Sequence, residues 1–323
     1  PEVTALLDSL ALPGVDAEAL APALRRRVGG NPAFLLESLK LLLSAGPGAA
    51  VDTLPLAPGI DAVVRRRLDL LSPPALQLAQ LASVAGAAFS PALATAVLGL
   101  STADLAQPMR ELEQRQLLYG RRFVHDLVAR AARGAVPDGV ARPLHCRVAE
   151  ALQHQGAAPA TLAAHWRAGG DLLRAGHCLR AAADAARLAL RPLEQCQWLD
   201  EAADCLDRAG DRDALFDTLE ARLQVSEAPD RAQRRLPLIE RLEALAGTPL
   251  QELRALSQRV GWHTDSARQD AHALGLQGLE RALALGHPEI AFGFLNGVAW
   301  QLAMAGKGPE AVQAIERHRA WAQ

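Results

Sequence analysis

The chain has few lysines, few aromatic residues and little net charge, and each shortage excludes a class of protein. Only two of its 34 Lys and Arg residues are lysines, Lys40 and Lys307, and neither stands in the Gly-Lys-Ser/Thr sequence that a P-loop needs. The chain as given is therefore not a self-sufficient P-loop ATPase and is not expected to act as an enzyme. A formal charge of −2 leaves no cationic excess for nucleic acid or anionic lipid.

Long apolar runs and cysteine frameworks are missing as well. No stretch approaches the roughly 20 apolar residues that cross a bilayer and no signal segment opens the chain, so we expect a cytoplasmic protein without membrane contact. The four cysteines, Cys146, Cys178, Cys196 and Cys205, form no CxxC pair, which indicates unpaired thiols and no metal site. Because the chain begins with Pro1 and not with Met, we expect it to be a piece of a longer protein.

The apolar residues that are present favour an all-α fold. Half of the 323 residues are apolar but only 4% are aromatic, so a core must consist mainly of Leu, Ala and Val. These are residues that suit close packing between helices. At this length two or three domains are expected.

The first expected domain, residues 1–57, carries two helices around a turn. Apolar residues recur at helical spacing over 21–28 and again over 33–43, with Gly30-Asn31-Pro32 between them. Residues 44–59 then collect glycine and proline, a composition that indicates a linker. We place the first boundary there.

The second expected domain, residues 58–140, has a winged-helix outline. Helical patterns over 63–71, 75–84, 90–98 and 102–116 precede apolar and aromatic residues flanking Gly120, which predict a small β-hairpin over 117–124. The candidate recognition helix over 102–116 carries Asp104, Glu111 and Glu113 beside two arginines. Because carboxylates repel DNA phosphates, this balance argues against direct DNA binding.

The third expected domain, residues 141–323, alternates helical stretches with turns at a nearly constant period. The turns fall at Ala168-Gly169, Ala209-Gly210, Ala246-Gly247 and Leu285-Gly286, at spacings of 41, 37 and 39 residues. Such a period is typical of helical hairpins of the tetratricopeptide type, each of which buries its apolar face on the next. The sequence therefore predicts an α-solenoid.

Six short motifs, in this order along the chain, resemble those of one family. They are Arg26–Glu37 around Gly30-Asn31-Pro32, Arg67–Ser72, Ala82–Phe89, Phe123–Leu127, Leu144–Leu152 and Leu162–Trp166. Together they are similar to the part that follows the P-loop module in STAND-type signal-transduction ATPases, notably the large ATP-dependent LuxR-type transcription regulators.

The resemblance implies a function that this piece shares with an upstream ATPase domain. Residues 1–57 would be the end of the helical lid, in which Gly30, Asn31 and Pro32 match the motif whose proline packs against adenine. His125 would match the winged-helix histidine that contacts the β-phosphate of bound ADP. Binding of ATP or ADP is implied only for the longer protein, and no cofactor is expected on this piece alone. The helical repeats would bind a signal, either a ligand or a protein.

Simpler interpretations of the same residues stay open. Gly30-Asn31-Pro32 is also what an interhelical turn requires, because Gly and Asn tolerate positive φ and Pro suits a first helical turn. His125 and Asp126 are also suited to a helix N-terminus, with Asp126 as the cap. The alternative function is a free-standing helical-repeat scaffold that binds a protein or peptide, and DNA binding through the winged helix is a third.

Overall fold

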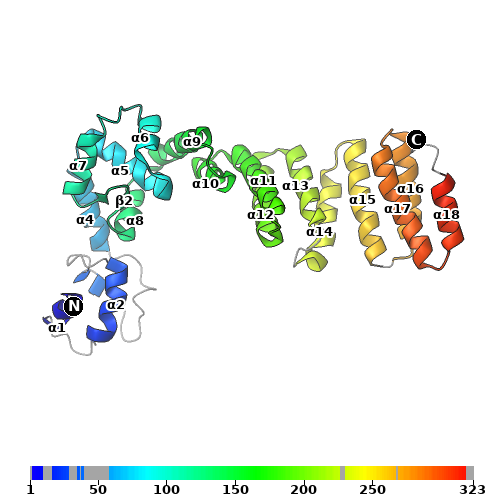
Figure 1. Ribbon diagram of the computed structural model, residues 1–323, viewed down its shortest axis with the longest axis horizontal. Coiled ribbons are helices and arrows are strands. Elements are labelled where there is room, and N and C mark those ends of the chain that lie inside the picture. Colours follow the sequence, from blue (N-terminus) through cyan, green and yellow to red (C-terminus); the bar gives the residue numbers. More distant parts are fainter. Residues whose placement is uncertain are drawn as a thin grey trace. The chain divides into compact units, whose positions relative to one another are not determined.

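The structure is a computed structural model that describes residues 2–9, 17–28, 35–36, 38–39, 58–225, 230–266 and 268–317. It is built almost entirely of α-helices, with one two-stranded sheet among the described residues (Figure 1), so the expected all-α class is confirmed. The chain forms two compact units. Unit 1 comprises 1–157 and 168–170, and unit 2 comprises 158–167 and 171–323.

Unit 1 contains the shorter helices and the sheet. Its elements are α1 (Glu2–Ser9), α2 (Ala17–Val28), α4 (Pro58–Asp69), α5 (Pro73–Ala85), the 3-10 turn η2 (Gly86–Ala88), α6 (Pro91–Leu98), α7 (Ala106–Gln114), β1 (Leu118–Tyr119), β2 (Arg122–Phe123), α8 (Asp126–Gly134) and α9 (Asp138–His154). Local signals set several of these bounds. The Ser90 side chain caps α6 by accepting from the backbone N–H of Leu93, and Gly99 in the left-handed region ends it.

Helix α5 is the centre of unit 1. It packs against α6, α7, α8 and α9, and it is buried on almost every side, as expected of a helix without a polar face. Ser72, at the N-terminus of α5, binds the carboxylate of Glu111 on α7 with its backbone N–H (2.8 Å) and its hydroxyl (2.5 Å). From α8, Arg133 donates to the carbonyl of Ser83 (3.0 Å). Polar side chains thus fasten the neighbouring helices to both ends of α5.

The expected β-hairpin is present and very short. Leu118 pairs with Phe123 and Tyr119 with Arg122 in antiparallel register. Gly120 takes φ 59° in the turn, a conformation that suits glycine because it has no Cβ. The N–H of Gly120 also donates to Glu113 (3.2 Å), which ties the hairpin to the end of α7.

Unit 2 is a succession of antiparallel helix pairs. Its helices are α10 (Pro159–Gly169), whose last two residues belong to unit 1, α11 (Leu172–Leu188), α12 (Pro192–Ala209), α13 (Arg212–Gln224), α14 (Arg231–Leu245), α15 (Pro249–Asp265), α16 (Ala271–Ala284), α17 (Pro288–Met304) and α18 (Gly308–Arg317). The helices α11, α13, α15 and α17 begin 40, 37 and 39 residues apart. The turns expected after Ala209, Ala246 and Leu285 separate successive pairs. We call α11–α18 the array.

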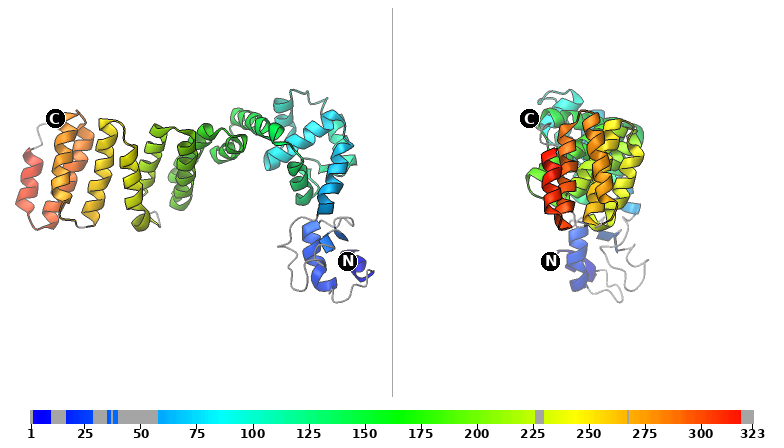
Figure 2. Two further views of the ribbon diagram at one scale, coloured as in Figure 1. Left: turned by 180° about the vertical axis from the view of Figure 1, so that it is seen from behind. Right: turned by 90° about the vertical axis from the view of Figure 1, so that its right-hand side faces the viewer.

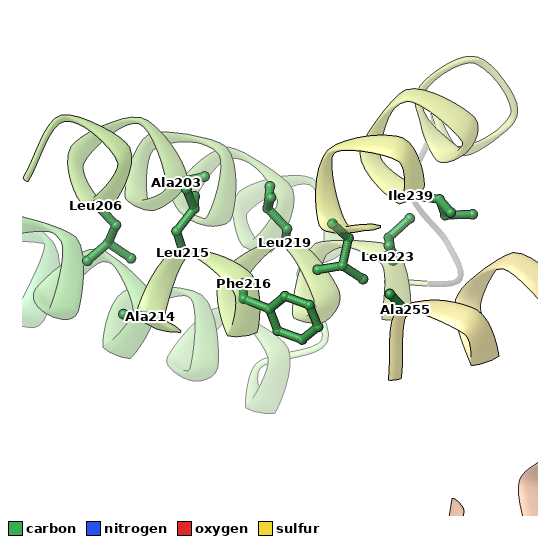
Figure 3. Packing of buried hydrophobic residues seen from close by; sticks show 10 residues of the cluster. Ala203, Leu206, Ala214, Leu215, Phe216, Leu219, Leu223, Ile239 and Ala255 are labelled. Carbon is green, nitrogen blue, oxygen red and sulfur yellow. The ribbon is translucent and has the colours of Figure 1, made fainter. Parts of the chain in front are cut away.

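Each helix of the array packs on the next one, and α13, α15 and α17 also contact each other in turn (Figures 1 and 2). Figure 3 shows one core, where Phe216 and Leu219 of α13 lie with Ile239 of α14 and Ala255 of α15. A second core joins Leu253 of α15 to α16 and α17. Apolar contacts therefore bind each pair to the following pair.

Ion pairs reinforce the same junctions. Arg254 of α15 binds Asp217 (2.8 Å) and Glu220 of α13, while its guanidinium lies over the ring of Phe216. Arg222 of α13 is 3% exposed and lies between Asp200 of α12 and Asp230 before α14. The charge of each arginine is balanced by two carboxylates, as a buried cation requires.

In the part of the chain that the structure describes, no helix is both long and apolar enough to cross a membrane.

Candidate functional site

His125 lies at the junction between the hairpin and α8. It is the N-cap residue of α8, with extended backbone (φ −154°, ψ 152°), and its Nδ1 accepts a hydrogen bond from the N–H of Leu127 (3.1 Å). The alternative that Asp126 caps this helix is wrong, because Asp126 is already its first helical residue. An N-cap side chain must precede the helix in order to reach its free N–H groups.

The capping bond restricts what His125 can offer to a ligand. An imidazole whose Nδ1 accepts a hydrogen bond carries its proton on Nε2, so Nε2–H is the ring's donor in this state. A doubly protonated ring would have no acceptor for the N–H of Leu127. Any phosphate contact that preserves the cap would therefore come from the neutral ring through Nε2.

The other expected site residues cannot be placed beside His125. Gly30, Asn31 and Pro32 lie outside the described residues. The expected helix before them is present as α2, which ends at Val28. Beyond them, Leu35, Ser38 and Leu39 are helical and buried.

The carboxylates of the candidate recognition helix are all bound within unit 1. The helix begins at Ala106 and not at 102, because Ser101 and Asp104 form a separate turn in which each side chain bonds the other's backbone N–H. The bond from Ser101 lowers the pKa of Asp104. Glu111 binds Ser72 and Glu113 binds Gly120, so these side chains have structural roles.

A cleft of about 410 Å³ opens in the array where α11 turns into α12. Its lining combines apolar Leu190, Leu199 and Val225 with the cations Arg187 and Arg191. Leu199 and Val225 belong to the buried core, whereas Leu190 is 87% exposed. The cleft thus offers an apolar floor with charged side chains at its edge, a composition that suits a peptide or a small amphipathic ligand.

Leu190 also has an unusual backbone. Its φ is +56°, whereas three other turns of the array use glycine at positive φ: Gly210, Gly286 and Gly306. A left-handed conformation costs a leucine about 1–2 kcal/mol, and here no buried contact offsets it. The sequence does contain a signal for this turn, because the helical period is interrupted at 188–191 and no glycine stands there. We did not predict the left-handed leucine from it.

In the described residues, three of the four cysteines lie in surroundings that do not activate their thiols. None of the four cysteines forms a disulfide; Cys196 and Cys205 are buried and the other two are half-buried. Burial raises the pKa of Cys178, Cys196 and Cys205, which keeps their thiols protonated and unreactive. Among these residues no group of His, Cys, Asp and Glu side chains has the composition of a metal site.

The candidate functional features are therefore a capping histidine in unit 1 and an apolar cleft in unit 2. Compared with protein-family models, curated proteins and solved structures, the chain matches none of them.

Proposed function

We propose that this chain is the regulatory, signal-sensing part of a STAND-type ATPase that acts as a transcription regulator. Residues 58–140 would be its winged-helix domain and residues 141–323 a solenoid of tetratricopeptide-like hairpins. The observation that carries the proposal is the array, whose pairs begin at a nearly constant period and share cores across every junction. An extended surface of this kind is suited to holding a protein or ligand along several repeats.

The signal would bind the array at the cleft beside Leu190. Leu188, Leu190 and Leu193 are all more than half exposed and follow one another around the α11–α12 turn. Exposed leucines grouped beside a cleft favour a partner with an apolar surface over a purely ionic one. The same observation supports the second candidate, a free-standing scaffold for a protein or peptide partner.

His125 would connect this unit to the nucleotide of the upstream ATPase domain. In the inactive state its Nε2–H would donate to the β-phosphate of ADP while Nδ1 continues to cap α8, and Pro32 would pack against adenine. Signal binding would then favour the packing in which ADP is exchanged for ATP. The signal acts through the difference between its affinities for the two packings.

Two variants of His125 separate the nucleotide role from the capping role in the longer protein that carries the ATPase domain. His125→Ala removes both the cap and the donor, whereas His125→Ser keeps a capping oxygen but cannot reach a phosphate. We expect both variants to raise transcriptional output in the absence of signal. If only the alanine variant changes output, His125 is a cap alone, and if neither changes it the proposed clamp is wrong.

The scaffold alternative predicts a different result. A pull-down with the purified ATPase domain would recover the chain if the regulatory proposal holds, and ADP would strengthen the recovery. Recovery that is absent with and without ADP would favour the free-standing scaffold.

A further inference from the structure

The turn between α11 and α12, which borders the cleft of the array, differs from comparable turns in one residue. It is closed by two backbone hydrogen bonds, from the N–H of Leu190 to the carbonyl of Arg187 (3.1 Å) and from the N–H of Arg191 to the carbonyl of Ala186 (2.9 Å). The same pair of bonds, with positive φ at the same position, closes three turns that use glycine: Gly210, Gly286 and Gly306. Leucine therefore occupies a position whose backbone suits glycine.

Leu190 weakens this turn without being buried in exchange. The left-handed backbone is unfavourable for leucine, and the side chain is 87% exposed, so burial within the chain compensates little of the cost. Residues held in unfavourable backbone conformations cluster at binding sites, where the strain is part of the function. The side chain of Leu190 lines the cleft. Its role is therefore to be sought in what the cleft binds and not in the stability of the array.

Two arginines beside Leu190 line the same cleft, and each forms only a weak ion pair. Arg187 and Arg191 are both more than half exposed. Their partners are Asp184 at 3.9 Å and Glu194 at 3.3 Å, each only three residues away in the chain. Exposed pairs of this kind contribute little to stability, so the carboxylate of a ligand can replace either partner at little cost.

Arginines elsewhere in the array connect helices. Arg241 of α14, for example, binds Asp207 of α12 at 2.9 Å. Arg187 and Arg191 instead pair with residues of their own turn of chain and point their charge at the cleft border. One carboxylate, Asp184, lines the cleft together with these two arginines, so the lining carries a surplus of positive charge. That surplus favours an anionic ligand.

The apolar part of the cleft has a buried floor and an exposed border. Leu199 of α12 and Val225 after α13 belong to a buried core, which fixes the floor. Leu188 and Leu193 flank Leu190 on the two adjacent helices (Figure 1) and are more than half exposed, although they are not among the lining residues. The apolar surface thus continues beyond a cavity of about 410 Å³. This extent favours a peptide that lies across the turn over a small molecule that the cleft would enclose.

We propose that the cleft binds an acidic peptide segment. An apolar side chain of the peptide packs on Leu190, Leu199 and Val225, and its carboxylates pair with Arg187 and Arg191. The apolar contact supplies most of the affinity, because it removes leucine surface from water. The exposed arginines select the sign of the peptide's charge and accelerate its approach. This inference rests on the proposed function, since it names the class of signal that the cleft takes.

Selection from a phage library of short random peptides on the immobilised 323-residue chain tests the proposal. We expect the enriched peptides to carry Asp or Glu on both sides of an aliphatic or aromatic residue. The double variant Arg187→Glu with Arg191→Glu should enrich Lys and Arg there instead, because the lining then attracts cations. Arg208→Glu with Arg317→Glu makes the same change of charge at exposed positions of α12 and α18 that do not line the cleft. This control should select the same acidic peptides as the native chain.

Leu190→Gly separates binding from folding. Glycine relieves the positive φ, so the melting temperature should be unchanged or higher. In fluorescence anisotropy, a labelled peptide from the native selection should nevertheless bind this variant about tenfold more weakly, because one leucine contact is lost. Higher salt should weaken the binding of the same peptide to the native chain, since the arginines are exposed to solvent.

The proposal is overturned if the native chain enriches basic or uncharged peptides, or none. It is also overturned if the charge-reversed double variant enriches the same acidic peptides as the native chain, which would place the binding on another surface. The selection uses the chain without the ATPase domain, so the two proposals can fail separately. Acidic peptides can bind although the His125 variants contradict the nucleotide clamp, and the clamp can hold although no acidic peptide binds.

Discussion

Removing the two carboxylates that hold Arg222 should destabilise the array more than removing Arg222 itself. The Arg222 side chain is 4% exposed, whereas those of Asp200 and Asp230 are 36% and 32% exposed. Asp200 accepts from Arg222 Nε at 3.0 Å, and both oxygens of Asp230 accept from Nη2 at 2.7 and 2.8 Å. The buried partner of this network is therefore the cation, and the carboxylates are the partners that water can reach.

The difference in burial sets the expected magnitudes. The double variant Asp200→Ala with Asp230→Ala leaves a guanidinium buried without compensation, a loss of about 3–5 kcal/mol. Arg222→Met keeps most of the side-chain volume, and Asp200 retains Arg234 at 2.6 Å. Water can solvate the two partly exposed carboxylates that remain without Arg222, so we expect a loss of no more than about 1–2 kcal/mol.

Urea unfolding followed by far-UV circular dichroism would measure both losses. The slope of the free energy of unfolding against urea must stay equal among the variants, because repeat arrays can lose two-state behaviour. The reasoning about burial would be refuted if Arg222→Met cost as much as the double variant. Asp200→Ala alone serves as a control, and its effect should be intermediate.

The same network gives a pH dependence with a definite sign. The hydrogen bond from Arg222 is the main reason that the pKa of Asp230 lies below its ordinary value of 3.8. A carboxyl with a lowered folded pKa stabilises the fold above its unfolded pKa, and the stabilisation is lost as the pH falls through the folded pKa. The difference in stability between the native chain and Asp230→Ala should thus be constant at neutral pH and shrink only below about pH 3.8.

Three further substitutions test single features by thermal or urea unfolding. Leu190→Gly should stabilise unit 2 by about 0.5–1 kcal/mol, because relief of the positive φ outweighs the added freedom of the unfolded chain, and a loss would contradict this account. Gly278→Ala should destabilise by up to about 2 kcal/mol, since its Cβ would overlap the ring of Phe294. His125→Ala should cost unit 1 about 1 kcal/mol through the lost cap, and an unchanged melting temperature would show that the capping bond is not significant.

Sequence reasoning located most of the helices, the hairpin and the period of the array. Ser90 and Gly99 delimit α6 because a cap and a left-handed residue act on the adjacent backbone. The start of α7 was misplaced, because a bond between Ser101 and Asp104 closes a separate turn that helical periodicity does not reveal. Whether His125 or Asp126 caps α8 depends on the residue at which the helix begins after β2, a difference of a single position.

Helices, turns and the repeat period were determined by the sequence itself, since hydrogen bonds and backbone preferences act between residues a few positions apart. Burial was decided only by the tertiary structure. Phe216 and Phe292 are the same residue at the same position of equivalent helices, yet one is enclosed and the other exposed. The pairing of Arg222 between Asp200 and Asp230 was equally unforeseen. Which neighbour covers a side chain depends on helices that are distant in sequence, and that information is not local to any segment.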